Sequence, residues 1–157
     1  MDMRRSLLVL TSFVALASHA AARSDVNPPL IEGVASVKDG DGIVIDGTEI
    51  RLQGIAAPED NAAKRERGGP ESTANLRSFV EGNVARCELD GTRTRNRPVG
   101  VCIVQGTDIG EYQVRTGHAR DCPRFSRGRY ARAEQAARAA GRDLSAIYAL
   151  PRYCVSS

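Results

Sequence analysis

Three charged residues in the middle of the chain have side chains that could act together on a phosphate group. Arg51 and Glu59 stand eight residues apart, and Arg97 ends the basic stretch Arg93-Thr-Arg-Asn-Arg97. Two guanidinium groups can hold the oxygens of a phosphodiester in forked geometry, and they stay charged at any working pH. A carboxylate beside the phosphate can accept a proton from an attacking water molecule. Taken singly, each residue is more simply a solvated surface charge, so only their combination indicates phosphodiester chemistry.

The sequence around these residues resembles the staphylococcal nuclease (thermonuclease) family. That family has a D-G-D turn, then an R-L-x-x-x-D-x-P-E motif, then a D-x-Y-G-R motif that carries a second arginine. Here Asp39-Gly-Asp-Gly precedes Arg51-Leu-Gln-Gly-Ile-Ala-Ala-Pro-Glu59, and Arg97 takes the place of the second arginine. The similarity covers about residues 31–145. It implies that Arg51 and Arg97 hold the phosphate, and that Glu59 is the general base or orients the water.

The same resemblance implies a divalent cation, although one of its expected ligands is missing. Asp41 matches a carboxylate ligand of the family, and Asp39 and the carbonyl oxygen of Ala57 are further candidates. Ala56 stands where the family has a second aspartate, and its side chain cannot coordinate a metal. Calcium affinity depends on the number of charged oxygen ligands. We therefore expect calcium to bind weakly, mainly together with a substrate phosphate.

The first 22 residues have the features of a secretory signal peptide. Arg4 and Arg5 form a positive segment, residues 7–17 are mostly apolar, and small residues offer a cleavage site after Ala20 or Ala22. The alternative is a membrane anchor, but the apolar run is short for a bilayer and no second such segment follows. We expect export to the periplasm or the medium, no stable membrane association after cleavage, and a linker over residues 23–30.

Cysteine usage agrees with export, because all four cysteines lie beyond the expected leader: Cys87, Cys102, Cys122 and Cys154. An even number in an oxidising compartment favours disulfides, and the lack of a C-x-x-C pair disfavours zinc. Four cysteines allow three connectivities. Cys87 and Cys102 fall in strands joined by a charged turn, and if they face each other the hairpin centre lies between residues 94 and 95. This favours Cys87–Cys102 and leaves Cys122–Cys154.

Apolar alternation and turn signals predict a barrel with helices. Strands are expected over five short runs: residues 34–38, 43–45, 49–55, 84–89 and 99–104. A helix that starts near Pro70 and ends at Gly82 separates the third and fourth strands, and helices over residues 109–115 and 129–140 follow. Residues 56–69 are expected to form a loop. The order fits an α+β, mainly β class, a five-stranded OB-type barrel with an inserted helix and C-terminal helices, in one domain over residues 31–154.

Charge is a weaker indicator of the partner. The chain has 22 Lys and Arg against 19 Asp and Glu, a net charge of +3, and removal of residues 1–22 leaves 20 against 18. Seven arginines gather toward the C-terminus: Arg120, Arg124, Arg127, Arg129, Arg132, Arg138 and Arg142. They could attract a polyanion, and they fit a solvated helix face equally well.

Two functions from different classes follow from these features. The first is an exported, monomeric nuclease that hydrolyses DNA or RNA with an Arg/Arg clamp, a glutamate base and a divalent cation. The second is a catalytically weak or inactive OB module that binds nucleic acid or another partner. Arg51, Glu59 and Arg97 favour the nuclease, and Ala56 favours the module.

Overall fold

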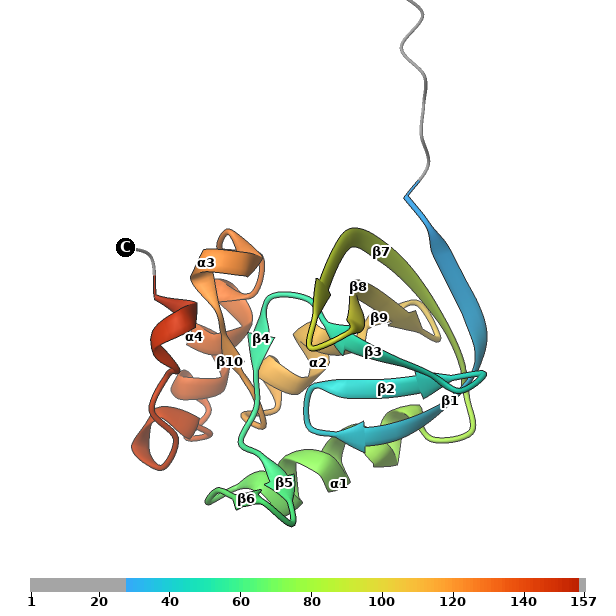
Figure 1. Cartoon of the computed structure of the whole chain (residues 1–157). Coiled ribbons are helices and arrows are strands. Elements are labelled where there is room, and N and C mark those ends of the chain that lie inside the picture. Colours follow the sequence, from blue (N-terminus) through green and yellow to red (C-terminus); the bar gives the residue numbers. More distant parts are fainter. Residues whose placement is uncertain (1–27, 156–157) are drawn as a thin grey trace, which may run out of the picture.

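A five-stranded barrel forms the centre of the protein in the computed structural model, which describes residues 28–155 (Figure 1). Its strands are β1 (Leu30–Asp39), β2 (Gly42–Ile45), β3 (Thr48–Leu52), β7 (Val84–Thr94) and β8 (Arg97–Val104). Neighbours in the order β3-β2-β1-β7-β8 are antiparallel, and β3 also pairs with β8 in parallel, which closes the barrel. The predicted OB-type barrel is therefore confirmed.

Helices cover the barrel and continue into a C-terminal part. α1 (Gly69–Val80) packs against β1, and α2 (Ile109–Arg115) packs against β8 and α1. The C-terminal part contains α3 (Pro123–Ser126), α4 (Ala131–Ala139) and the 3-10 turns η1 (Leu144–Ala146) and η2 (Arg152–Cys154). Figure 1 shows this part beside the barrel, with β4 (Ile55–Ala56) between the two. Within residues 28–155, no helix is both long and apolar enough to cross a bilayer.

Three short strand pairings complete the fold. β4 pairs with β10 (Arg120–Asp121), so the chain leaving the barrel after β3 is joined to the C-terminal part. β5 (Asp60–Asn61) and β6 (Lys64–Arg65) form a small hairpin inside the predicted loop of residues 56–69. β9 (Thr107–Asp108) extends the sheet beyond β8 and leads directly into α2, where the Asp108 carboxylate caps the helix.

Alternating burial explains why β8 forms a strand and which face meets the core. Pro98, Gly100, Cys102 and Val104 are buried, and the residues between them are half-buried. The main core contains barrel side chains such as Ile43 and helix side chains of α1 and α2. A second, separate cluster consists of Ala56, Cys122, Leu144, Tyr148 and Cys154. This second cluster attaches the C-terminal tail to β4.

Both predicted disulfides are present. Cys87 lies opposite Cys102 in the β7–β8 ladder, with their Cα atoms 4.0 Å apart. Cys122, just before α3, is bonded to Cys154 at the end of η2, with a Cα separation of 4.6 Å. The first bond joins adjacent strands of the barrel. The second joins η2 to the segment before α3 within the second cluster.

The predicted centre of the β7–β8 hairpin is wrong by one residue. Thr94 pairs with Arg97, so the turn residues are Arg95 and Asn96, at φ 46° and 70°. Two successive positive φ values are typical of the tight hairpin turn whose twist matches that of the strands. The cause is an irregularity between Leu89 and Arg93, where β7 gains two residues relative to β8. The strands consequently extend through most of the charged stretch expected to be a turn.

Several element bounds also differ from the sequence prediction. β1 begins at Leu30, within the predicted linker, because its first residues pair with β7. The third strand ends at Leu52 rather than residue 55, and the last long helix begins at Ala131 rather than residue 129. The helix over residues 109–115 has the predicted bounds. The predicted signal peptide and residues 23–27 of the linker lie outside the described residues.

Candidate functional site

Arg51 lies in β3 and is held by two partners from neighbouring segments. The β2–β3 register places Arg51 opposite Gly42, next to Asp41, and its Nη1 forms an ion pair with Asp41 Oδ1. Its Nη2 donates to the carbonyl oxygen of Ile55 at 3.0 Å, and only 14% of its side chain is exposed. The other oxygen of Asp41 accepts a hydrogen bond from the Ala57 amide at 3.1 Å. Asp41 therefore bridges Arg51 and the segment that leads to Glu59.

Arg97 lies at the start of β8 and is paired with Glu49. Because β3 and β8 are parallel and Arg51 lies opposite Val99, Glu49 lies in register with Arg97 two residues earlier. Arg97 Nη1 and Glu49 Oε1 are 3.0 Å apart, and both side chains are partly exposed. Beside them is an open hollow of about 340 Å³, lined by the β2–β3 and β7–β8 turns. Arg93 and Arg95 also line it, so three arginines and one glutamate contribute to its wall.

Glu59 follows β4 and is held by the β5–β6 hairpin. Asn61 Nδ2 donates to Glu59 Oε2 at 3.0 Å, and the Glu59 amide donates to Glu66 Oε2 at 2.9 Å. Lys64 forms an ion pair with the same Glu66 at 2.8 Å. The loop expected from the sequence therefore contains a hairpin stabilised by hydrogen bonds and an ion pair. The hydrogen bond from Asn61 holds the Glu59 carboxylate in position.

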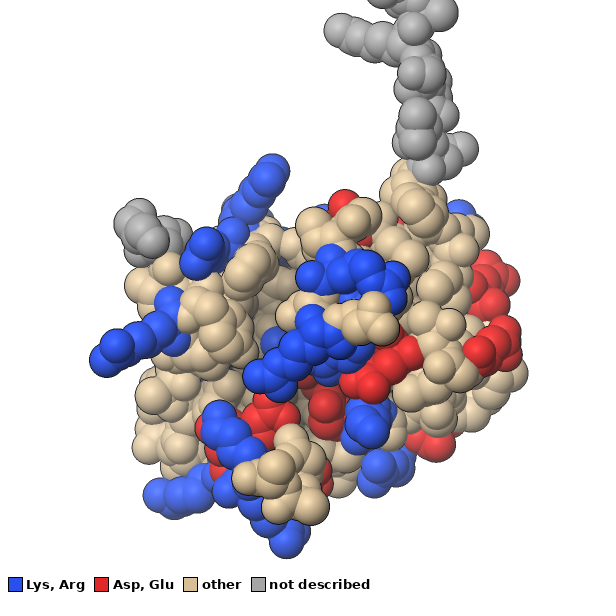
Figure 2. All heavy atoms as spheres, in the orientation of Figure 1, with Lys and Arg blue, Asp and Glu red and all other residues tan. Residues whose placement is uncertain are grey.

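The charges of Arg97 and Glu59 act on the guanidinium of Arg51. Burial of the guanidinium lowers the pKa of Arg51, and the positive charge of Arg97 lowers it further. Tyr153, Asp39 and Glu59 act in the opposite direction. All four groups are consequently near Arg51, which stays protonated because arginine begins from a very high pKa. Figure 2 shows Lys and Arg side chains around a smaller acidic group near the middle of this face.

The carboxylates do not form a ready calcium site. Asp41 has one oxygen on Arg51 and the other on the Ala57 amide, and Asp39 Oδ1 accepts from the Asp41 amide at 3.2 Å. Ala56 and Ala57 are buried, with exposed fractions of 0% and 5%. Residues 28–155 contain no group of three or more Asp, Glu, His or Cys placed to hold a metal. The donors present therefore do not fit a resident calcium ion, which usually takes six to eight oxygens.

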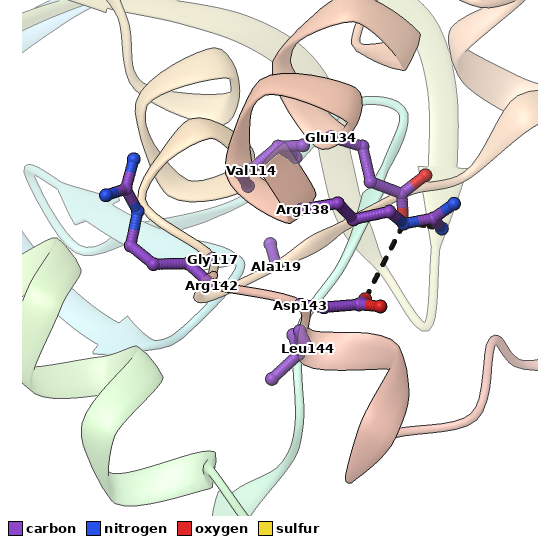
Figure 3. Close-up of a pocket in the computed structure, with 9 residues that line it drawn as sticks. Val114, Gly117, Ala119, Glu134, Arg138, Arg142, Asp143 and Leu144 are labelled. Carbon is purple, nitrogen blue, oxygen red and sulfur yellow. Dashed lines mark ion pairs between the residues drawn. The ribbon is translucent and has the colours of Figure 1, made fainter. Parts of the chain in front are cut away.

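Three of the seven C-terminal arginines are paired with acidic neighbours. Arg120 and Arg138 both pair with Glu134, at 3.0 and 3.3 Å, and Arg129 lies 3.8 Å from Asp108. Figure 3 shows the Arg138–Asp143 ion pair, 3.5 Å long, at the rim of a hollow between α2, α4 and η1. This hollow has no room for a water molecule. Within residues 28–155, the other four arginines of this group form no ion pair, so only part of its charge is neutralised: Arg124, Arg127, Arg132 and Arg142.

Sequence reasoning missed three residues that belong to this region. Glu49 is brought to Arg97 by the parallel β3–β8 pairing, and Asn61 reaches Glu59 through the short β5–β6 hairpin. The Tyr153 phenol acts on the ionisation of Arg51, and the Cys122–Cys154 disulfide attaches the segment of Tyr153 to the residue before α3. The disulfide prediction was the available signal for Tyr153, since it placed residue 154 beside the segment before α3.

Comparison with known proteins identifies the family of the chain. The family model described as staphylococcal nuclease homologue matches residues 49–145, which include Arg51, Glu59 and Arg97. The chain belongs to this family. It is similar to the succinoglycan biosynthesis protein ExoI of Rhizobium meliloti (strain 1021), with 35% identity over 134 residues that cover 80% of this chain and 68% of that protein.

Proposed function

We propose that the protein is an exported nuclease that hydrolyses phosphodiester bonds of DNA or RNA as a monomer. The observation that carries this proposal is that Arg51 and Arg97 lie on the paired strands β3 and β8, within the matched family segment, and that the charge of Glu59 acts on Arg51. Its relative is named for succinoglycan biosynthesis and not for cleavage of nucleic acid, so the proposed activity rests on the site. Two disulfides support export, because such bonds persist in oxidising compartments.

In the proposed reaction, the two arginines neutralise the phosphate and the glutamate moves a proton. A guanidinium has five N–H donors, so Arg97 can keep Glu49 and still donate to a phosphate oxygen. Water forms a bond to phosphorus while Glu59 accepts its proton, and the bond to the leaving sugar oxygen breaks. That oxygen takes a proton from solvent. Asn61 keeps the Glu59 carboxylate in place for this step.

The role of Arg51 in phosphate binding depends on Asp41, because Arg51 is mostly buried and its charge is already neutralised by that carboxylate. A phosphate entering beside it competes with Asp41 for the same guanidinium. We propose that Asp41 orients Arg51 and lowers its affinity for anions in the free protein. Calcium, in this proposal, binds weakly to the free chain and more tightly once substrate oxygens are present.

The alternative is a nucleic-acid-binding module on the same scaffold. The observation in its favour is the combination of Ala56 with an Asp41 carboxylate whose two oxygens already have partners. Incubation of the purified protein with plasmid DNA and with RNA, in calcium, in other divalent ions and in EDTA, distinguishes the two. Cleavage supports the nuclease, and retention of intact nucleic acid in a complex under every condition supports the module.

A further inference from the structure

The C-terminal tail (residues 144–155) packs against β4, the short strand that leads from the barrel toward Glu59. Ala56 of β4 is fully buried, and it shares the second cluster with Cys122, Leu144, Tyr148 and Cys154. A Cβ atom on Gly68 would lie 3.3 Å from Ile147 Cδ1 and 3.5 Å from Pro58 Cγ. The tail therefore contacts β4 and lies beside the residue that precedes Glu59.

The residues on either side of Ala56 hold the proposed phosphate-binding side chains in place. The carbonyl oxygen of Ile55 accepts a hydrogen bond from Arg51 Nη2 at 3.0 Å. The amide of Ala57 donates to Asp41 Oδ2 at 3.1 Å. A shift of β4 would move both partners at once, and a displacement of about 1 Å at a reacting group can lower a rate by about 100-fold. The position of the tail on β4 therefore bears on the geometry of the site.

The end of the tail has few links to the rest of the molecule. Among residues 28–155, no hydrogen bond joins residues 149–155 to another segment, and the Cys154 amide donates to Pro151 within the tail. Its links are apolar packing and the disulfide to Cys122. The Cys122 amide in turn donates to the carbonyl of Gly54, next to β4, at 2.9 Å. The disulfide thus completes a connection from the end of the tail to the start of β4.

We propose that the C-terminal tail positions the site through β4, and that the Cys122–Cys154 disulfide makes this positioning depend on the redox state of the surroundings. The inference rests on the proposed nuclease function and adds a condition under which the site works. A dithiol reduces the bond with two electrons and two protons, which gives two protein thiols, and the dithiol becomes a disulfide. The end of the tail then leaves β4, and Arg51 and Asp41 lose their fixed partners.

This control would limit cleavage to oxidising surroundings. Thiol reductants keep most cysteines reduced in the cytoplasm, whereas disulfides persist in exported proteins. A nuclease that needs its tail disulfide is therefore impaired before export and gains full activity once the bond forms outside.

The disulfide of the barrel provides a matched control. Cys87 and Cys102 join β7 to β8 in the main core, and neither belongs to the second cluster. The double variant Cys87→Ala/Cys102→Ala lacks the barrel disulfide, so dithiothreitol can act only on its tail disulfide. The double variant Cys122→Ala/Cys154→Ala lacks the tail disulfide, so dithiothreitol can act only on its barrel disulfide.

Two measurements on the wild type and both variants, with and without dithiothreitol, test the proposal. The first is the cleavage rate of a labelled single-stranded oligonucleotide. The second, which needs no activity, is amide hydrogen exchange of Ala57 in EDTA. The amide of Ala35, which donates to Asn83 at 2.9 Å in the barrel, is the internal control. Mass spectrometry after alkylation confirms reduction, and thermal unfolding checks that each protein is folded at the assay temperature.

Dithiothreitol should slow cleavage by the wild type and by the variant without the barrel disulfide at least about tenfold, and reoxidation should restore both rates. In the same two proteins it should speed the exchange of Ala57 at least about tenfold, with that of Ala35 unchanged, because the opening is local. The variant without the tail disulfide should cleave slowly and exchange Ala57 rapidly under both conditions.

Unchanged exchange of Ala57 in the reduced variant without the barrel disulfide overturns the positioning role of the tail, whatever the activity. Undiminished cleavage by that reduced variant overturns the redox control. Unfolding of the whole protein by dithiothreitol at the assay temperature also overturns the proposal, because the effect would then not be local. If the oxidised wild type cleaves nothing while the exchange of Ala57 responds as expected, the proposed function fails and the link between the tail and β4 stands.

Discussion

Restoring the missing carboxylate with Ala56→Asp should make the stability of the protein depend on calcium. Ala56 is fully buried and packs with Cys122, Leu144, Tyr148 and Cys154. An uncompensated charge in such a place destabilises a fold by about 3–5 kcal/mol. The Asp41 carboxylate lies beside this position, since it accepts a hydrogen bond from the Ala57 amide. Its negative charge would repel that of an aspartate at position 56. For a domain of this size, the melting temperature in EDTA should fall by roughly 10–20 °C.

Calcium should reverse much of this loss, because the ion would neutralise both carboxylates in the folded state. At about 100 times its dissociation constant, a ligand stabilises the folded form by about 2.7 kcal/mol. The variant should therefore regain roughly 10 °C in calcium. The wild type, with Asp41 already paired to Arg51, should gain little. Activity of the variant at low calcium should exceed that of the wild type.

Thermal unfolding and calorimetric calcium titration of the wild type, Ala56→Asp and Ala56→Asn measure these effects. Ala56→Asn is the matched control, since its side chain has nearly the same size without the charge. Tight calcium binding by the wild type would refute the reasoning from the missing ligand. So would an Ala56→Asp variant whose stability and calcium affinity match those of Ala56→Asn.

Three further predictions concern the disulfide, the pH dependence and the ion pair beside the clamp. Replacing Cys122 and Cys154 together by alanine should lower the free energy of unfolding in urea by about 2–4 kcal/mol, and an unchanged midpoint would contradict this. Burial lowers the pKa of His118, so the unfolded chain binds the proton more readily, and stability should fall as the pH drops below about 6.5. His118→Gln should flatten that part of a melting-temperature profile, and an unaltered profile would show that another group is responsible. Glu49→Gln, which removes the partner of Arg97, should change the free energy of unfolding by less than about 1 kcal/mol, because ion pairs open to solvent contribute little. A larger loss on urea unfolding would contradict this small contribution.

The barrel was predictable because its strands and turns are specified by residues close together in the sequence. Alternating apolar residues mark the strands, and the Asp46-Gly47 turn has the positive φ values, 47° and 76°, that this residue pair favours. The disulfide between Cys87 and Cys102 followed from the predicted hairpin of β7 and β8. The displaced turn at Arg95–Asn96 did not, because the irregularity in β7 has no clear signature in the charged stretch that contains it.

The partners within the site were not predictable, because they depend on contacts between segments far apart in the sequence. Glu49 meets Arg97 only after β3 and β8 close the barrel in parallel, a pairing that no turn signal specifies. Tyr153 lies in a segment without periodicity, and its place depends on the bond between Cys122 and Cys154. The ion pair between Asp41 and Arg51 was not predicted either, because it depends on the register between β2 and β3.

Cleavage of a labelled single-stranded oligonucleotide by the purified wild type, Glu59→Gln, Arg97→Ala and Glu49→Gln tests the central claim most directly. The wild type and Glu49→Gln should cleave at similar rates. Glu59→Gln and Arg97→Ala should be slower by at least about tenfold with unchanged melting temperatures, because loss of a general base or a fixed cation removes stabilisation of the transition state. Equal rates in all four proteins would place the activity elsewhere, and a wild type inactive with every divalent ion would contradict the nuclease function.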